Sequence, residues 1–305
     1  MIIVHLKPKK EESLRRFHPW VFSGAIQRIA GKPAEGDLVR VVDCDGNFLA
    51  TGHYQIGSIA VRVVSFDDVE IDNRFWGDKI SKAYAMREAL GLVKAGYNDT
   101  YRLVHGEGDS LPGLIVDVYD DTAVVQAHSV GMHFIREAIA QAIVAEVPAV
   151  KHVYYKSETT LPFKAPIDPE DGYLIGEETE KLSALESGLT FHVDWLPGQK
   201  IGFFVDQREN RSLLERYSEG KSVLNMFCYT GGFSVYAMRG GAKLVHSVDS
   251  SAKAIDLTNK NIAANYPNDE RHASFAEDAF KYLNANEKQY DLIILDPPAF
   301  AKHRD

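Results

Sequence analysis

A pair of glycines stands where an apolar run meets a helical pattern, and an acidic residue closes the next apolar run. Residues 223–249 read VLNMFCYTGGFSVYAMRGGAKLVHSVD, with Gly231 and Gly232 at the turn. Glycines let a ligand approach the backbone closely, and the free amide groups of a helix N-terminus attract a carboxylate or phosphate. Asp249 lies 18 residues after Gly231, the reach at which an acidic side chain accepts hydrogen bonds from ribose hydroxyls. The spacing predicts a nucleotide-like ligand, with a purely structural turn as the alternative.

Two more acidic side chains follow at the ends of later strands. Asp278 lies where a third strand is expected to end, and Asp296-Pro297-Pro298-Ala299-Phe300 closes the run LIILD. Consecutive prolines stiffen a turn and remove backbone donors. We therefore expect the Asp296 carboxylate to be held at the carboxyl edge of the sheet, where open α/β sheets bind ligands. The dinucleotide pattern GxGxxG is not met at the glycine turn, which argues against an NAD enzyme.

These side chains share one edge only if strands and helices alternate in the last third of the chain. The apolar patterns predict helices at 206–217, 232–239, 251–264 and from about 279, and strands at 222–227, 243–248, 272–275 and 290–295. Such alternation is typical of a parallel sheet with right-handed crossovers. The fold class expected for this part is a Rossmann-like α/β sheet that ends after its fourth strand.

The middle of the chain predicts an α+β unit. Asp72 can cap a helix that runs to about Leu92. Strands are expected near 101–105, 111–119, 122–128, 152–156 and 189–195, with a helix at 131–147. The segment His105-Gly106-Glu107-Gly108-Asp109 has the composition of a catalytic or metal-binding loop, but a tight structural turn is the favoured interpretation.

The amino-terminal part predicts a small β unit that could bind RNA. Residues 37–66 alternate β-branched stretches with turn signals. Ahead of them, Arg15, Arg16, His18 and Trp20 mix basic and aromatic side chains, which could hold phosphates and stack a base. The alternative is that Trp20 belongs to the core and the arginines are merely solvated.

Charge and composition narrow the class of protein. The chain has 305 residues and a net charge of −9, but residues 1–66 hold nine Lys/Arg against six Asp/Glu. A locally basic face can bind phosphate even in an acidic chain. The run Leu292–Leu295 is far shorter than the ~20 residues that span a bilayer, and no signal peptide is recognised. Cys44 and Cys228 predict neither a disulfide framework nor a zinc site, so we expect no metal, no membrane association and a cytoplasmic location.

The series of strand-end residues resembles the class I S-adenosylmethionine-dependent methyltransferases. In that family the glycine turn approaches the methionine end of the cofactor, the acid after the second strand holds the ribose, and the acid after the third contacts adenine. A (D/N)PP(F/Y) motif after the fourth strand faces the target base. The resemblance assigns catalytic roles to Asp296, Pro297 and Phe300.

The resemblance narrows with KIGFFVDQRENR at 200–211, LNMFCYTGGFSVYA, RLVHGEGDSLPGLIVD and HPWVFSGAI. These motifs are similar to the RlmI-like family of large-subunit ribosomal RNA cytosine-5 methyltransferases, over essentially the whole chain. The resemblance implies a PUA-like RNA-binding domain at 1–71, a central β-β-α-β-β domain at 72–190 and a partial methyltransferase domain at 191–305. Ribosomal RNA is the implied partner, and a homodimer is left open. S-adenosyl-L-methionine is the implied cofactor, bound by Phe203, Gln207, Arg208, Phe227, Tyr229, Thr230, Gly231, Gly232, Asp249, Ser250, Asp278 and Asp296.

One departure from the family concerns the nucleophile. Methylation of cytosine at carbon 5 needs a cysteine thiolate that adds at carbon 6, and the family supplies it from a cysteine after the fifth strand. We expect that cysteine beyond residue 305 and expect the 305-residue chain to be an inactive fragment, with Cys228 packing beside the glycine turn. Two other functions stay open: methylation of an exocyclic amine of a purine in RNA, and RNA binding by a protein with a vestigial cofactor fold.

Overall fold

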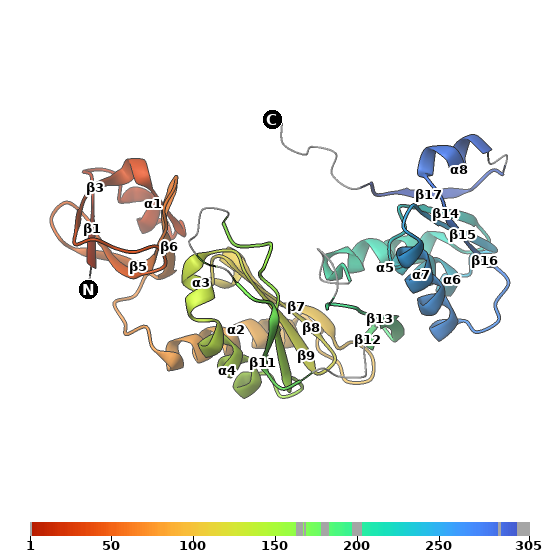
Figure 1. The fold of residues 1–305 in the computed structure, drawn as a ribbon, viewed down its shortest axis with the longest axis horizontal. Coiled ribbons are helices and arrows are strands. Elements are labelled where there is room, and N and C mark those ends of the chain that lie inside the picture. The colour runs from red at the N-terminus through yellow and green to blue at the C-terminus, as the bar shows by residue number, and fades with distance from the viewer. Residues whose placement is uncertain are drawn as a thin grey trace. The chain divides into compact units, whose positions relative to one another are not determined.

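The computed structural model describes residues 2–162, 167, 169–177, 183–196, 203–285 and 288–297. Contacts divide the chain into two compact units (Figure 1). One unit comprises residues 1–94 and 100–180, and the other comprises residues 95–99 and 181–305.

The amino-terminal part of the first unit is a sheet of short strands in the order β2-β6-β5-β4-β1-β3. Its buried face carries apolar side chains such as Val4, Val41 and Val61. The parallel pairing of β1 with β4 brings the start of the chain into the sheet, an addition to the hairpins predicted at 37–66. The elements are β1 (Ile2–Leu6), α1 (Glu12–Arg15), β2 (Trp20–Phe22), β3 (Ile26–Ala30), β4 (Leu38–Val42), β5 (Phe48–Tyr54) and β6 (Ile59–Ser65).

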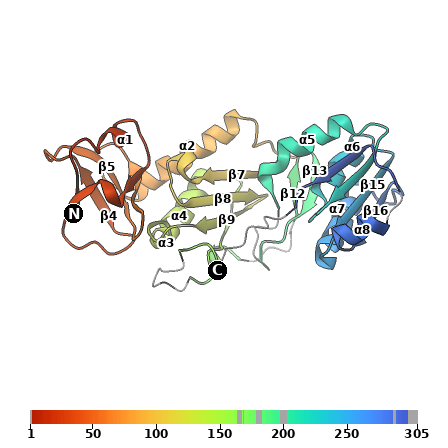
Figure 2. The same cartoon turned by 90° about the horizontal axis from the view of Figure 1, so that it is seen from above.

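The rest of the first unit consists of helices and a second sheet, whose strands follow the order β11-β10-β9-β8-β7. Figure 2 shows β7, β8 and β9 side by side. Asp72 caps α2 as predicted, because its side chain accepts a hydrogen bond from the backbone N–H of Phe75. The helix predicted at 131–147 is two helices that meet at Ile135. The elements are α2 (Asn73–Ala89), β7 (Thr100–His105), β8 (Leu114–Tyr119), β9 (Thr122–Ala127), α3 (Val130–Phe134), α4 (Arg136–Glu146), β10 (His152–Tyr155) and β11 (Gly172–Ile175).

The second unit contains a parallel sheet in the order β16-β15-β14-β17. Strands and helices alternate along the chain as the sequence predicted, so the carboxyl ends of the four strands meet at one edge. The elements are α5 (Arg208–Tyr217), β14 (Ser222–Met226), α6 (Gly232–Arg239), β15 (Leu244–Asp249), α7 (Ala252–Asn265), β16 (His272–Ala276), α8 (Ala279–Ala285) and β17 (Leu292–Leu295).

A short hairpin of β12 (Ser183–Glu186) and β13 (Leu189–His192) also belongs to the second unit. The sequence analysis instead grouped the strand predicted at 189–195 with the α+β part in the middle of the chain. The side chains of Asn261 and Asn265 in α7 bond the backbone N–H groups of His192 and Thr190, which holds the hairpin on this unit. No helix in the described ranges combines the length and apolarity needed to cross a membrane.

Candidate cofactor site

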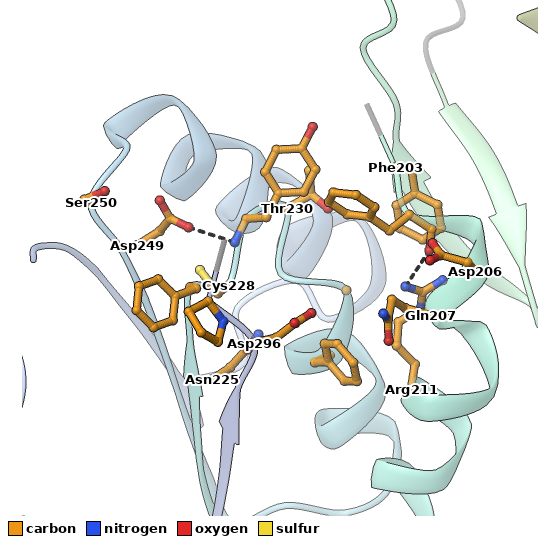
Figure 3. Close-up of a pocket in the computed structure, with 16 residues that line it drawn as sticks. Phe203, Asp206, Gln207, Arg211, Asn225, Cys228, Thr230, Asp249, Ser250 and Asp296 are labelled. Atoms are coloured by element: carbon orange, nitrogen blue, oxygen red, sulfur yellow. Dashed lines mark hydrogen bonds between the residues drawn. The ribbon is translucent and has the colours of Figure 1, made fainter. Parts of the chain in front are cut away.

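A cavity of about 440 Å³ opens at the carboxyl edge of the parallel sheet (Figure 3). Its volume lies in the range of ~300–1,000 Å³ that is usual for small-molecule sites. The walls come from the segment before α5, the loop between β14 and α6, and the ends of β15 and β17. The lining residues are Phe203, Phe204, Asp206, Gln207, Arg211, Asn225, Phe227, Cys228, Tyr229, Thr230, Gly232, Phe233, Asp249, Ser250, Asp296 and Pro297.

The loop after β14 has an unusual backbone. Phe227, Tyr229 and Gly231 take positive φ angles of 55°, 48° and 73°. Glycine adopts this conformation freely, but for an aromatic residue it is strained. A Cβ at Gly231 would also lie 2.6 Å from the Thr258 side chain. Strain of this kind persists where surrounding contacts enforce it, and it gathers at binding sites.

The enforcing contacts come from α7 and β15. The Thr258 hydroxyl donates to the carbonyl of Tyr229 (2.9 Å), and the Asn261 amide donates to the carbonyl of Thr230 (2.8 Å). Asp249 accepts from the backbone N–H of Tyr229 (3.0 Å). Sequence reasoning missed Thr258 and Asn261. Their spacing of three residues on the buried face of a helix was the available signal.

Asp249 combines a structural contact with an open position. One carboxylate oxygen accepts from Tyr229 and the other accepts from the backbone N–H of Ser251 (2.9 Å). A carboxylate has about four acceptor sites, so capacity remains for the neighbouring hydroxyls of a ribose. The half-buried Asp249 lines the cavity beside Ser250. The donor set therefore fits the nucleoside part of a nucleotide-like ligand.

A buried ion-pair network supports the opposite wall. Glu186, from β12, is fully buried and accepts from Arg208 (3.2 Å), Arg211 (2.7 and 2.8 Å) and the hydroxyl of Tyr236 (2.9 Å). Arg211 also donates to the carbonyl of Phe204 (2.9 Å), and its guanidinium lies 4.5 Å from the centre of the Phe203 ring. The network holds the Phe203-Phe204 segment at the cavity.

Comparison with known proteins decides the class. Residues 102–304 match the S-adenosylmethionine-dependent methyltransferase family, and residues 4–66 match the PUA-like domain. The chain belongs to the S-adenosylmethionine-dependent methyltransferases. The predicted fold class, methyl-transfer activity and cofactor are thereby confirmed.

Relatives and solved structures agree with this membership. Proteins named ribosomal RNA large subunit methyltransferase I from Alteromonas mediterranea and Shewanella amazonensis are 39% and 41% identical, over 99% of this chain and 76% and 77% of theirs. A Streptococcus mutans structure described as a SAM-dependent methyltransferase has a TM-score of 0.81 and 27% identity, over 98% of this chain and 77% of its own. A second solved structure, described as a methyltransferase in complex with SAH, has a TM-score of 0.83 and 27% identity, over 99% of this chain and 77% of its own.

The methyltransferase cavity gathers most of the residues predicted to bind the cofactor. Arg208, Gly231 and Asp278 are not among the lining residues. Arg208 pairs with Glu186, and Asp278 accepts from the backbone N–H groups of Phe280 and Lys281 at the start of α8. Asp296 and Pro297 line the cavity at the end of β17, whereas Phe300 lies outside the described residues.

The two cysteines of this methyltransferase are poor nucleophiles. Cys228 is buried against Thr258, and burial raises the pKa of its thiol to about 12. Desolvation and the neighbouring carboxylates of Asp45 and Asp43 raise the pKa of the exposed Cys44 as well. Both side chains are therefore thiols at neutral pH, and a thiol is a much weaker nucleophile than a thiolate.

The predicted RNA-binding residues lie in the first unit, and none of them is among the residues that line the cavity. The Trp20 indole donates to Glu107 (2.8 Å), and the same carboxylate oxygen accepts from Arg62 (2.9 Å). Arg15 is exposed and lies 3.7 Å from Asp43, Arg16 is exposed, and the His18 ring meets Trp20 edge to face. Glu107 comes from the His105–Asp109 turn, so that turn has a structural contact with the amino-terminal sheet. No cluster of three metal-ligating side chains occurs among the described residues.

Proposed function

We propose that this methyltransferase modifies large-subunit ribosomal RNA at carbon 5 of a cytosine. The observation that carries the substrate is the similarity, over 99% of the chain, to relatives named ribosomal RNA large subunit methyltransferase I. That similarity includes the PUA-like region as well as the methyltransferase region. A basic amino-terminal unit beside an otherwise acidic chain supports an RNA substrate.

The cavity supports a specific placement of S-adenosylmethionine. Asp249 at the end of β15 would accept from the ribose hydroxyls. The N-terminus of α6, at Gly231 and Gly232, would take the carboxylate of the methionine end. Phe203 and Gln207 would then cover the cofactor from the side of α5. When bound, the cofactor supplies an electrophilic methyl group.

Asp296 is the proposed contact to the target base. It follows β17, which pairs directly with β14, so its backbone stands next to the loop that holds the methionine end. A carboxylate there can accept from the exocyclic amine of a cytosine. Orientation of the base does not activate carbon 5, and neither Cys44 nor Cys228 provides the thiolate. The carbon-5 reaction therefore needs a thiolate other than those of Cys44 and Cys228.

The raised pKa values of Cys44 and Cys228 favour a second candidate function, methylation of an exocyclic amine of a purine, because that reaction needs no thiolate. Product analysis separates the two. The full-length protein would be incubated with methyl-labelled S-adenosylmethionine and unmethylated large-subunit rRNA, and the RNA digested to nucleosides. Label in 5-methylcytidine supports the proposal. Label in an N-methylated purine would overturn the target atom, and label only in other RNAs would overturn the substrate.

The ribose assignment gives a quantitative prediction. Replacement Asp249→Ala should weaken S-adenosylmethionine binding by about 1.5–3 kcal/mol, the contribution of hydrogen bonds to a charged group. Calorimetry measures the change. Asp256→Ala, which removes an exposed carboxylate from α7 outside the cavity lining, is the matched control. Unchanged affinity for the Asp249 variant would refute the assignment.

A further inference from the structure

A chain of hydrogen bonds crosses the interior of the second unit from the cavity to the far strand of the sheet. Asn225 donates from its side-chain amide nitrogen to the Ser234 hydroxyl (3.0 Å), and Ser234 contacts the Ser247 hydroxyl (2.7 Å). Ser247 in turn contacts Nε2 of His272 (2.8 Å). Asn225 and Ser247 are partners in the register of β14 and β15, and Ser234 lies above them in α6. Asn225, Ser234 and Ser247 are at most 1% exposed.

Each serine hydroxyl can donate or accept, and the lone pair of a neutral His272 ring sets one direction along these hydrogen bonds. In that direction Asn225 donates to the Ser234 oxygen, Ser234 donates to Ser247, and Ser247 donates to Nε2 of His272, which carries the lone pair. Burial, with a smaller effect of His246 that exceeds the opposing effect of Asp269, lowers the pKa of His272 to about 4. The ring is neutral at pH 7, so one of its nitrogens is free to accept.

The other atom of the Asn225 amide faces a different environment. Among the described residues, no hydrogen bond reaches its carbonyl oxygen, and Asn225 is one of the residues that line the cavity (Figure 3). β14 lies between β15, which ends in Asp249, and β17, which Asp296 follows. The carbonyl oxygen is thus the acceptor that Asn225 has left for a ligand.

We propose that Ser234, Ser247 and His272 are positioning residues that lock the Asn225 amide with its carbonyl oxygen toward the cavity, where it accepts a hydrogen bond from the ammonium group of S-adenosylmethionine. This inference rests on the proposed placement of the cofactor. With the ribose at the end of β15 and the carboxylate at the start of α6, the amino-acid end lies over β14, where Asn225 is. A flipped amide would present its NH₂ group to a cation and repel it.

Interrupting the hydrogen-bond chain at Ser247 tests whether it fixes the orientation of the Asn225 amide, without altering Asn225 itself. In the variant Ser247→Ala, Ser234 loses its acceptor and can donate to the Asn225 oxygen instead, which turns the amide. We expect S-adenosylmethionine to bind about tenfold more weakly, the effect of one hydrogen bond to a charged group. The matched control is Ser274→Ala, at the register partner of Ser247 in β16, whose hydroxyl bonds Asn259 outside the chain.

Two further measurements separate the lock from a general loss of packing. 5′-Methylthioadenosine has the nucleoside but no amino-acid end, so Ser247→Ala should leave its affinity unchanged. An equal loss of affinity for both ligands would mean that the hydrogen-bond chain only maintains the fold. In an Asn225→Asp background the side chain presents an acceptor in either orientation, so adding Ser247→Ala should cost no further affinity for S-adenosylmethionine. A full additional loss would also contradict the lock.

The protonation state of His272 provides a test that needs no ligand. In the ¹⁵N spectrum of the histidine rings at pH 7, we expect Nε2 of His272 to lack a proton. A proton on Nε2 would reverse the chain and overturn the proposal. Failure of the unmodified protein to bind S-adenosylmethionine would refute the proposed function instead, while wild-type affinity in Ser247→Ala would refute only the lock.

Discussion

The buried side chain of His53 makes the stability of the fold depend on pH. It lies in β5, stacks on Trp76 with 6.1 Å between ring centres, and its Nδ1 has no hydrogen-bond partner among the described residues. Burial lowers the pKa of the ring to about 4. An apolar site of this kind tolerates a neutral imidazole and opposes its protonated form.

The pH dependence of stability follows from this shift. The folded pKa lies below the unfolded value of about 6.5, so the unfolded chain binds more protons at intermediate pH. His53 should therefore reduce the free energy of unfolding as pH falls from about 6.5 to about 4, by up to roughly 3 kcal/mol. Urea unfolding at several pH values should show a shallower dependence for His53→Leu. The exposed His105→Leu is the control, and an unchanged slope for His53→Leu would contradict the burial effect.

Within the helices, replacement of two glycines by alanine should change stability in opposite directions. A Cβ at Gly131 in α3 would lie 2.2 Å from the ring of His53, whereas a Cβ at Gly77 in α2 would lie 3.7 Å from its nearest neighbour, a Glu146 oxygen. Gly131→Ala should destabilise the first unit by about 1–3 kcal/mol through overpacking. Gly77→Ala should instead stabilise it by about 0.5–1 kcal/mol, the helix preference of alanine. Thermal unfolding of both variants is the measurement, and equal shifts would mean that α3 does not pack on β5 this tightly.

Elements with a local signature could be predicted from the sequence. Helix α7 begins after Ser251, whose hydroxyl accepts from the backbone N–H of Ala254, and the strands of the parallel sheet are apolar runs between turns. β11 and β12 escaped prediction, although they are no shorter than β10, which was predicted. The sequence of β12, SALE, has none of the β-branched or aromatic residues that mark a strand, and β11, GYLI, begins with a glycine. The acidic strand ends of the site were predictable in the same way. Asn225 and Ser247 were not, since buried polar contacts between residues far apart in the sequence leave no local pattern.

At the scale of the molecule, charge is divided unevenly along the chain. Residues 67–190 hold eleven Lys/Arg against twenty-two Asp/Glu, whereas the amino-terminal 66 residues carry an excess of three positive charges. Within the first unit, Glu107 accepts from both Trp20 and Arg62. These bonds connect the basic sheet to the acidic part of the same unit. Trp20 is thus committed to an intramolecular hydrogen bond, and Arg15 and Arg16 are the more accessible candidates for RNA contact.

RNA binding should therefore depend on this arginine pair. Each phosphate contact contributes to the decrease of affinity with salt, by about 0.7 in the slope of log K against log salt for a single strand. The double variant Arg15→Gln with Arg16→Gln should weaken binding to large-subunit rRNA and make the slope shallower by up to about two contacts. Arg28→Gln with Lys32→Gln removes the same charge from exposed positions in and just after β3 of the same sheet. Filter binding at several salt concentrations compares the two. If both variants change slope and affinity equally, RNA responds to net charge alone; if the Arg15 and Arg16 variant changes neither, the pair does not touch RNA.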